Sequence, residues 1–360
     1  MRERVIAELR ARGASRQKTL VENLRTVGAR GLLETAVASA RGLLLPFPEA
    51  PKPEPRHSGE PILLEAKTAH PVMEREAYSS FSWLDVEGYD AEIDRRRTGG
   101  AIDAEEAKLL RAWAVNGYMV LPGCVSSELI DQALADVDAV WRDRKHVVID
   151  VLTDGRRTHV DEVEPAARQA PHKLNDLYLV SHSALRIFLH ERIVRMVSLI
   201  LDDDVVGCNS LTFEYGSMQP AHIDHVYMTP LTPRRLVASW IALQDVQSDA
   251  GPLSLWPGSH RLRPYDFGGT YHYSPEKEAQ HTRYVAEQAG RFPEFRFMAK
   301  KGDVLLWHAL LVHGGSPINN KQRTRKSMAC HYFGSRETGS SPRERFGPAS
   351  YLSKPIEDTA

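Results

Sequence analysis

The clearest hydrophobic patterning lies in the second half of the chain and predicts a β scaffold. Residues 236–243 form a nearly continuous apolar run, which is typical of a buried strand. Residues 251–258 and 302–307 each join a short apolar run to glycine or proline, which predicts a strand next to a turn. Such runs dominate after Val205, so this half of the chain is expected to form a sheet-rich core.

The pattern between about residue 103 and Val205 predicts helices that flank this core. Apolar positions recur there at helical spacing, and a serine, which is a favoured N-cap residue, opens one of the segments. The expected elements are helices at 104–116, 127–142, 176–188 and 192–201, and a strand at 118–121.

Residues 1–100 are patterned differently. Residues 1–45 carry apolar positions at helical spacing among arginines and predict a helical N-terminal extension. Prolines then alternate through residues 46–55, which predicts a Pro-rich linker, and residues 46–100 as a whole are expected to be linker and irregular segment, with residues 81–84 as an anchor on the folded domain. The amphipathic extension leaves three roles open: packing on the core, docking on a partner, or peripheral contact with a membrane surface.

Composition narrows the class of protein. The 360 residues are 42% hydrophobic with a formal net charge of −1, which gives no indication of a nucleic-acid partner. Three widely spaced cysteines form no disulfide framework and favour a reducing compartment. No run approaches the roughly 18 apolar residues that span a bilayer, and no signal peptide is visible. We therefore expect a cytoplasmic protein without a transmembrane segment; the oligomeric state stays open.

Two histidines and one aspartate in the β-rich half are candidate metal ligands. Alternate side chains of a strand point to the same face, so His222 and Asp224 can bind one ion while Ile223 points away. His313, from a later strand, supplies a third ligand. Two imidazoles and one carboxylate on one face of an octahedral ion favour ferrous iron, with the opposite positions open for a co-substrate and dioxygen.

The same tripeptide pattern occurs a second time, at His159, Val160 and Asp161. This stretch is charged and lacks the apolar alternation of a buried strand, so it is expected to be a surface loop.

The motifs around the candidate ligands resemble the phytanoyl-CoA dioxygenase family of iron- and 2-oxoglutarate-dependent oxygenases. Residues 116–123 and 126–130 are similar to the opening strand and helix of that family. The resemblance covers roughly residues 105–340, and its other motifs occur in the order of the family: Trp240 to Asp245, Gly251 to Leu253, Pro257 to His260, Gly302 and Asp303, His313 and Gly314, and Arg325 to Ser327.

The resemblance implies that His222, Asp224 and His313 hold the iron and that Arg325 pairs with the distal carboxylate of 2-oxoglutarate. A guanidinium suits this role because its planar fork matches a carboxylate and stays charged when buried. Arg325 lies 12 residues after His313, which is one residue more than the commonest spacing of the family. Arg323 has the same strand parity and is the alternative, but the residues after Arg325 match the closing strand better.

By the same resemblance, Lys173 and Trp240 fall where family members contribute to the co-substrate pocket. The ordinary alternatives are a solvated lysine at a helix start and a core aromatic side chain. His225, His260 and His308 are expected to be structural hydrogen-bonding residues, with His260 in a turn, because three protein ligands already suffice.

The implied fold is mainly β with flanking α: a double-stranded β-helix (jelly roll, cupin-like) with N-terminal helices. It would span residues 101–345, before a C-terminal tail at 346–360. The implied enzyme uses Fe(2+), 2-oxoglutarate and O2, with ascorbate as a candidate reductant, to hydroxylate an unactivated C–H bond of a small-molecule or lipid-like substrate. Succinate and CO2 are released. Residues 268–296 are expected to form a lid, and Tyr227 and Met228 to contact the substrate.

Two other classes of protein remain open. The same ligands could hold zinc in a hydrolase or isomerase, or belong to a non-catalytic binding protein. Arg325, as a candidate partner for a carboxylate, argues against a zinc hydrolase or isomerase. Three aligned, buried polar ligands argue against a non-catalytic binding protein, because they would cost stability if they were unpaired. The substrate itself is not determined: an acyl-CoA, an amino acid, a natural product and a lipid-linked compound all fit.

Overall fold

The structure, a computed structural model, describes residues 82–153, 155–228, 235–268, 271 and 273–353. The chain divides into two compact units, Met1–Arg56 and His57–Ala360, and all of the described residues belong to the second. The predicted helical extension at 1–45 and the Pro-rich linker therefore lie outside the described residues. Among the residues that are described, no helix is long and apolar enough to cross a membrane.

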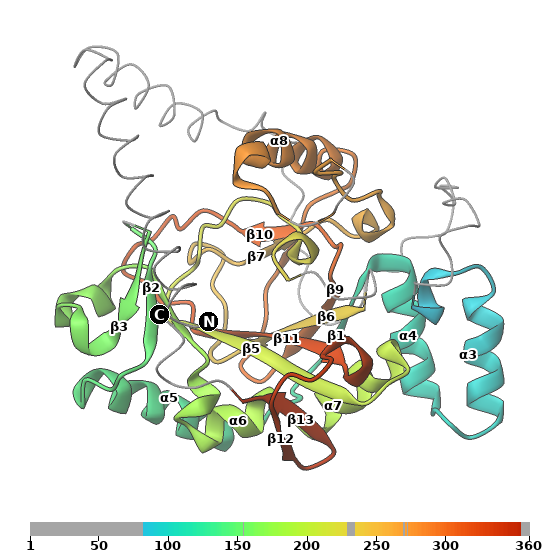
Figure 1. The fold of residues 1–360 in the computed structure, drawn as a ribbon, viewed down its shortest axis with the longest axis horizontal. Helices are drawn as coiled ribbons and strands as arrows, with labels where there is room; N and C mark the ends of the chain where they lie inside the picture. Colours follow the sequence, from blue (N-terminus) through green and yellow to red (C-terminus); the bar gives the residue numbers. More distant parts are fainter. Residues whose placement is uncertain (1–81, 154, 229–234, 269–270, 272, 354–360) are drawn as a thin grey trace, which may run out of the picture. The chain divides into compact units, whose positions relative to one another are not determined.

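Two sheets form the centre of the described unit (Figure 1). The large sheet has ten strands, with the main path β1-β9-β6-β11-β5-β4-β2-β3, and the small sheet has three, in the order β10-β7-β8. Neighbours pair antiparallel throughout, except that β13 runs parallel to β5. The strands are β1 Tyr118–Leu121, β2 Val148–Val151, β3 Arg156–His159, β4 His172–Asn175, β5 Val205–Phe213, β6 Leu236–Ala242, β7 Leu253–Leu255, β8 Phe295–Phe297, β9 Val304–His308, β10 His313–Gly315, β11 Ser327–Gly334, β12 Arg343–Phe346 and β13 Ala349–Leu352.

Helices cover the large sheet on one face, and the small sheet packs on the other (Figure 1). Every residue of β6 is buried, because one face meets the helix-side core and the other meets the small sheet. α8 lies on the side of the small sheet (Figure 1). The helices are α3 Tyr89–Thr98, α4 Ala104–Asn116, α5 Ser127–Arg142, α6 His182–Phe188, α7 Glu191–Leu201 and α8 Glu278–Ala289.

Two predicted helices and the strand between them are confirmed residue for residue, because their ends carry strong local signals. Asp103 caps α4 in a capping box with Glu106, and Gly117 ends it with φ 77°. Ser126 caps α5 by accepting a hydrogen bond from the amide of Leu129.

Three predictions of secondary structure need correction. The helix expected at 176–188 is a 3-10 turn, Leu177–Leu179, followed by α6, because the backbone of Ser181 between them is extended, with φ −134° and ψ 114°. Residues 89–98, expected to be irregular, form α3; only Ile93 of this helix is buried, so it has almost no apolar periodicity to detect. Part of the expected C-terminal tail forms β13, which pairs with β5.

The predicted anchor at residues 81–84 is confirmed for its described part. Ser82 Oγ donates to the carbonyl of Ile200 at 2.8 Å, and Trp83 Nε1 donates to the carbonyl of Leu199 at 2.9 Å. Leu84 is buried in the helix-side core. These contacts fix the segment to the end of α7.

The second tripeptide is not the exposed loop that was expected. His159 ends β3 and is buried, with its ring stacked on His146 at a centroid distance of 3.6 Å, and Val160 is buried as well. Only Asp161 is exposed. The charged neighbours hid a short edge strand whose last residue, His159, is buried.

Substituting Gly302 with alanine should destabilise the fold by about 3 kcal/mol. Gly302 has φ 92°, and an added Cβ would lie 2.5 Å from the carbonyl oxygen of Val125. Left-handed backbone costs alanine roughly 1 kcal/mol, and the clash with rigid backbone adds the rest. Urea unfolding at neutral pH measures the loss.

Gly100→Ala is the matched control. Gly100 has φ 74°, but an added Cβ there meets nothing within 4 Å. It should cost only the conformational part, about 1 kcal/mol. Equal losses at both positions would contradict a clash at Gly302.

Candidate metal centre

His222, Asp224 and His313 converge at one point. One nitrogen or oxygen atom from each lies within 4.8 Å of the others, and this is the one such group among the residues that the structure describes. Asp224 Oδ1 lies 3.6 Å from Nε2 of His222 and 3.5 Å from Nε2 of His313. The spacing leaves room for an ion bound by all three side chains.

A short antiparallel bridge brings the two histidines together. The amide of His222 donates to the carbonyl of His313 at 2.8 Å, and the reverse bond is 3.0 Å. The predicted strand geometry holds for His222 only, because Asp224 begins a 3-10 turn, Asp224–Val226. The turn points the carboxylate back towards both imidazoles.

The donor set suits a divalent metal because each ring is held in one orientation. His222 Nδ1 lies 2.9 Å from the carbonyl of Pro220, and His313 Nδ1 lies 2.9 Å from the carbonyl of Leu311. Each Nδ1 therefore carries the proton that it donates, and each Nε2 faces the other ligands with its lone pair free.

The charges of the site suit the same group. Burial, together with the neighbouring His313, lowers the pKa of His222 to about 3, so this imidazole is neutral at pH 7. Burial would raise the pKa of Asp224, but His313 and His331 outweigh it and hold the carboxyl ionised. Burial lowers the pKa of His313, yet the Asp224 carboxylate outweighs burial and raises it, as the negative charge of this ligand would also favour a bound cation.

Arg325 is a buried cation, and no carboxylate of the described residues forms an ion pair with it. It is 2% exposed, and its Nε has no hydrogen-bond partner. Its guanidinium lies over the rings of Trp240, at 5.3 Å, and Phe213, at 5.8 Å, and burial lowers its pKa to about 10. Arg323 is different: it is exposed and pairs with Asp249 at 3.1 Å.

Lys173 and Trp240 lie on the same face of the large sheet as Arg325. Lys173 is half-buried in β4, opposite Phe213, and pairs with Asp150 at 3.3 Å, so it is not a lysine at a helix start. Ser327, two residues after Arg325, is fully buried opposite Phe213 with an Oγ that has no hydrogen-bond partner. Ser327 was not selected as a site residue from the sequence. It could have been, because it lies two residues after Arg325 and therefore on the same face of an extended strand.

Two residues that sequence reasoning missed contact the carboxylate of Asp224. Trp307 Nε1 donates to Oδ2 at 2.9 Å, and His331 Nε2 lies 3.3 Å from the same oxygen. Neither belongs to a short motif, so only the strand neighbours identify them.

The family model described as phytanoyl-CoA dioxygenase matches residues 113–327, which is more than half of the chain. The chain belongs to the phytanoyl-CoA dioxygenase family. It is therefore an iron- and 2-oxoglutarate-dependent oxygenase, as the sequence motifs predicted.

Relatives and solved structures agree with this assignment. The peroxisomal phytanoyl-CoA dioxygenase of Rattus norvegicus is 24% identical over 302 residues, which is 77% of this chain and 79% of the relative. That of Mus musculus is 26% identical over 231 residues, 60% of this chain and 65% of the relative. The fold is similar to that of the epimerase SnoN in complex with Fe3+ and alpha ketoglutarate (TM-score 0.52, 18% identity, 69% of this chain and 98% of that one) and of the carbocyclase SnoK (0.51, 17%, 72% and 96%).

Three further histidines, His308, His260 and His225, contact residues other than the candidate ligands. His308 Nε2 lies 3.3 Å from Asp85 Oδ2, and its Nδ1 accepts from the amide of Leu310. His260 packs beside His308 in a 3-10 turn, and His225 is buried near Tyr271. All three lie outside the ligand group, as predicted.

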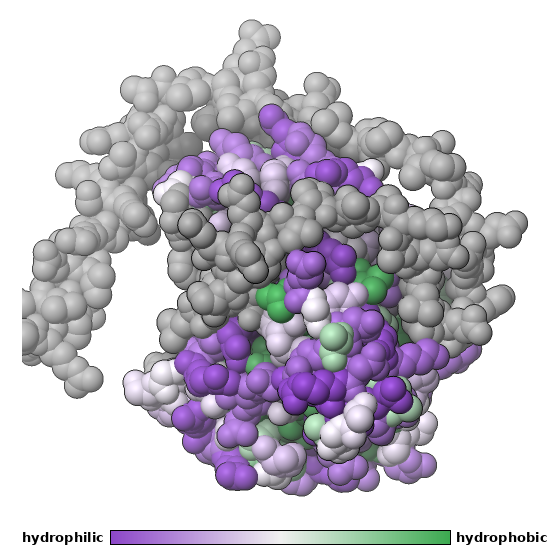
Figure 2. Space-filling model, turned by 90° about the vertical axis from the view of Figure 1, so that its right-hand side faces the viewer, coloured by the Kyte–Doolittle hydropathy of each residue, from purple (hydrophilic) through white to green (hydrophobic). Residues whose placement is uncertain are grey.

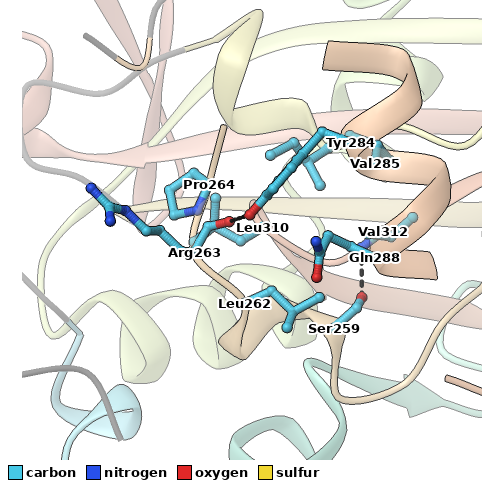
Figure 3. A pocket seen from close by; sticks show the side chains of 10 residues that line it. Ser259, Leu262, Arg263, Pro264, Tyr284, Val285, Gln288, Leu310 and Val312 are labelled. Atoms are coloured by element: carbon cyan, nitrogen blue, oxygen red, sulfur yellow. Dashed lines mark hydrogen bonds between the residues drawn. The ribbon is translucent and has the colours of Figure 1, made fainter. Parts of the chain in front are cut away.

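A small pocket lies behind the turn that begins at Asp224, beneath α8 (Figure 3). Ile223 and Val312, the neighbours of the candidate ligands, point into it and pack with Val285 of α8. Ser259 Oγ accepts from the amide of Val312 at 2.9 Å. Part of the predicted lid is therefore a helix that supports the ligand segments from behind.

Replacing Arg325 with methionine should stabilise the protein without 2-oxoglutarate by about 1–3 kcal/mol. The folded pKa of Arg325 is lowered, so its charged form costs stability at every pH below about 10, and a methionine of similar length removes that cost. Urea unfolding at pH 7.5 measures the gain.

Arg323→Met is the control and should change stability by less than about 0.5 kcal/mol, since that side chain is exposed. A methionine at 325 that destabilises the protein would show that the guanidinium has a stabilising partner.

Proposed function

We propose that His222, Asp224 and His313 bind ferrous iron and that Arg325 binds the distal carboxylate of 2-oxoglutarate. The observation that most supports this proposal is the buried guanidinium of Arg325, which pairs with no carboxylate of the described residues. A cation left unpaired in the core is costly, and a dicarboxylate co-substrate would remove that cost by pairing with it. Arg323 cannot do so, because it is exposed and already paired with Asp249.

Three further side chains support the co-substrate pocket. Trp240 forms an apolar wall against the guanidinium, and Ser327 offers an unused buried hydroxyl. Lys173 lies opposite Phe213, with its charge paired with Asp150. These groups orient a dicarboxylate and exclude water from it. The finer architecture we infer is a double-stranded β-helix, with residues 101–345 as the catalytic domain.

When bound, iron with 2-oxoglutarate and O2 supplies the oxidant for an otherwise inert C–H bond. The protein holds the ligands in one protonation state, with both Nδ1 protons donated to backbone carbonyls. We propose hydroxylation, with release of succinate and CO2 and with ascorbate as reductant. A zinc hydrolase is disfavoured because hydrolysis has no use for a buried arginine that lacks a counter-ion.

The substrate is proposed to approach past Tyr227. Among the described residues Tyr227 is an exposed large side chain, at 51%, and its ring meets His222 edge-on at 6.2 Å. Tyr273 lies 5.2 Å from Tyr227, and its amide donates to the carbonyl of Val226. Most of the described surface on the face shown in Figure 2 is hydrophilic. An exposed tyrosine that packs against half-buried Tyr273, beside the candidate ligand His222, suits an apolar part of a substrate.

The names of the relatives bear on the substrate and the cellular location of this chain. They are called phytanoyl-CoA dioxygenase, peroxisomal, which favours an acyl-CoA or another lipid-like substrate for this chain. They also make a peroxisomal location an alternative to the cytoplasmic location that composition predicts. Enzyme assays on acyl-CoA, amino-acid and natural-product panels would decide the substrate class.

Anaerobic titration with ferrous iron and 2-oxoglutarate should produce the weak visible charge-transfer band of the chelate. His222→Ala should abolish the band, because it removes a ligand. Arg325→Ala should weaken 2-oxoglutarate binding by at least about 30-fold, since losing one partner of a buried charge pair costs roughly 2–5 kcal/mol. Arg323→Ala should leave both the band and the affinity for 2-oxoglutarate unchanged. Tight zinc binding without a band in the wild type would refute the oxygenase assignment.

Once succinate release identifies a substrate, Tyr227→Ala should raise its KM by about 10-fold, because an exposed aromatic contact is lost. Tyr227→Phe keeps the ring and should keep the wild-type KM. The affinity for 2-oxoglutarate should not change in either variant. An unchanged KM in Tyr227→Ala would place substrate entry elsewhere.

A further inference from the structure

We propose that Trp307 and His331 are positioning residues that hold Oδ2 of Asp224, so that Asp224 presents only Oδ1 to the metal. This inference rests on the proposed iron site. It assigns a purpose to two buried side chains that none of the sequence motifs includes.

The two oxygen atoms of Asp224 have different neighbours. Oδ2 lies 2.9 Å from Trp307 Nε1 and 3.3 Å from His331 Nε2. Oδ1 instead faces Nε2 of His222 and of His313, at 3.6 and 3.5 Å. One oxygen is therefore occupied by hydrogen bonds while the other points at the candidate ligands.

The large sheet places both donors in one row. Trp307 on β9 and His331 on β11 are each in register with Ala238 on β6, the strand between them. All three therefore point to the face that meets the small sheet. Ala238 is fully buried and small, and its side chain leaves space for the carboxylate between the two larger ones.

Asn209 extends this row and fixes the His331 ring. It is opposite His331 on β5, and its Oδ1 lies 2.7 Å from His331 Nδ1. With Nδ1 engaged by Asn209, the ring turns its Nε2 towards Asp224. The amide of Asn209 can either donate or accept, so the pair is satisfied whether His331 carries one proton or two.

Restricting Asp224 to one oxygen matters for this reaction class. A carboxylate that binds through both oxygens uses one more coordination position than a carboxylate that binds through one. An oxygenase needs the open positions for its co-substrates. Hydrogen bonds to the second oxygen keep those positions free and orient the ligand before the metal binds.

Cobalt(II) binding to the apoprotein tests this, because its visible spectrum reports the number and kind of ligands. His331→Leu and Trp307→Phe should each weaken cobalt binding by about 10–100-fold and change the spectrum. His331→Gln retains a side-chain N–H donor and should recover most of the affinity. The ferrous 2-oxoglutarate band should shift in the same two variants.

Tyr332→Phe is the matched control. It removes a buried hydroxyl, bonded to Phe188 and Ser239, from the next residue of β11 on the opposite face. It should lower thermal stability but leave cobalt affinity and spectrum unchanged. If His331→Leu does not fold, Trp307→Phe decides the matter by itself, since it removes the other donor to Oδ2 of Asp224.

The outcomes separate the two claims. Wild-type affinity and spectrum in Trp307→Phe and in folded His331→Leu would overturn the positioning role and leave the proposed iron site intact. Cobalt binding that is equal in the wild type and in His222→Ala would overturn the iron site, and the positioning role with it. Weak binding in Tyr332→Phe as well would mean that general destabilisation, and not Asp224, is the cause.

Discussion

The antiparallel bridge between His222 and His313 is the contact on which the rest of the site depends. Its two backbone hydrogen bonds join segments that lie far apart in the sequence and place both imidazoles beside each other. Each ring is then fixed by its own Nδ1 bond to a carbonyl two residues earlier. The 3-10 turn that begins at Asp224 adds the carboxylate. Backbone geometry, more than side-chain packing, therefore defines where a metal binds.

The two faces of the large sheet carry different kinds of side chain. The face towards the helices is apolar and supplies most of the core, whereas the face towards the small sheet carries the functional side chains in successive strands. Arg325, Trp240 and Lys173 lie on that face, as do Trp307 and His331. Because side chains alternate along a strand, the same strands that stabilise the fold also point these groups towards the small sheet.

The buried charge of Arg325 costs stability, although it is proposed to bind the co-substrate. A guanidinium without a counter-ion is unfavourable in a core, and nothing in the described structure compensates it except contact with aromatic faces. Such a group is tolerated because the helix-side core is large and the bound co-substrate would pair with it. The Asp224 carboxylate is the opposite case, since it is surrounded by hydrogen-bond donors before any metal arrives.

The sequence alone determined the elements with strong local signals and the candidate ligands. α4 and α5 were predictable because capping residues coincide with apolar spacing, and His222, Asp224 and His313 follow from residue type and order, whereas Arg325 follows from the family resemblance. Weakly periodic α3 and the buried edge strand at His159 were not predictable, because their stability comes from neighbours. Only the tertiary structure decided that Arg325 and not Arg323 is buried, and that Trp307 and His331 flank Asp224. Those facts depend on which strands are adjacent and in which register, and no local pattern encodes the register of strands so far apart in the chain.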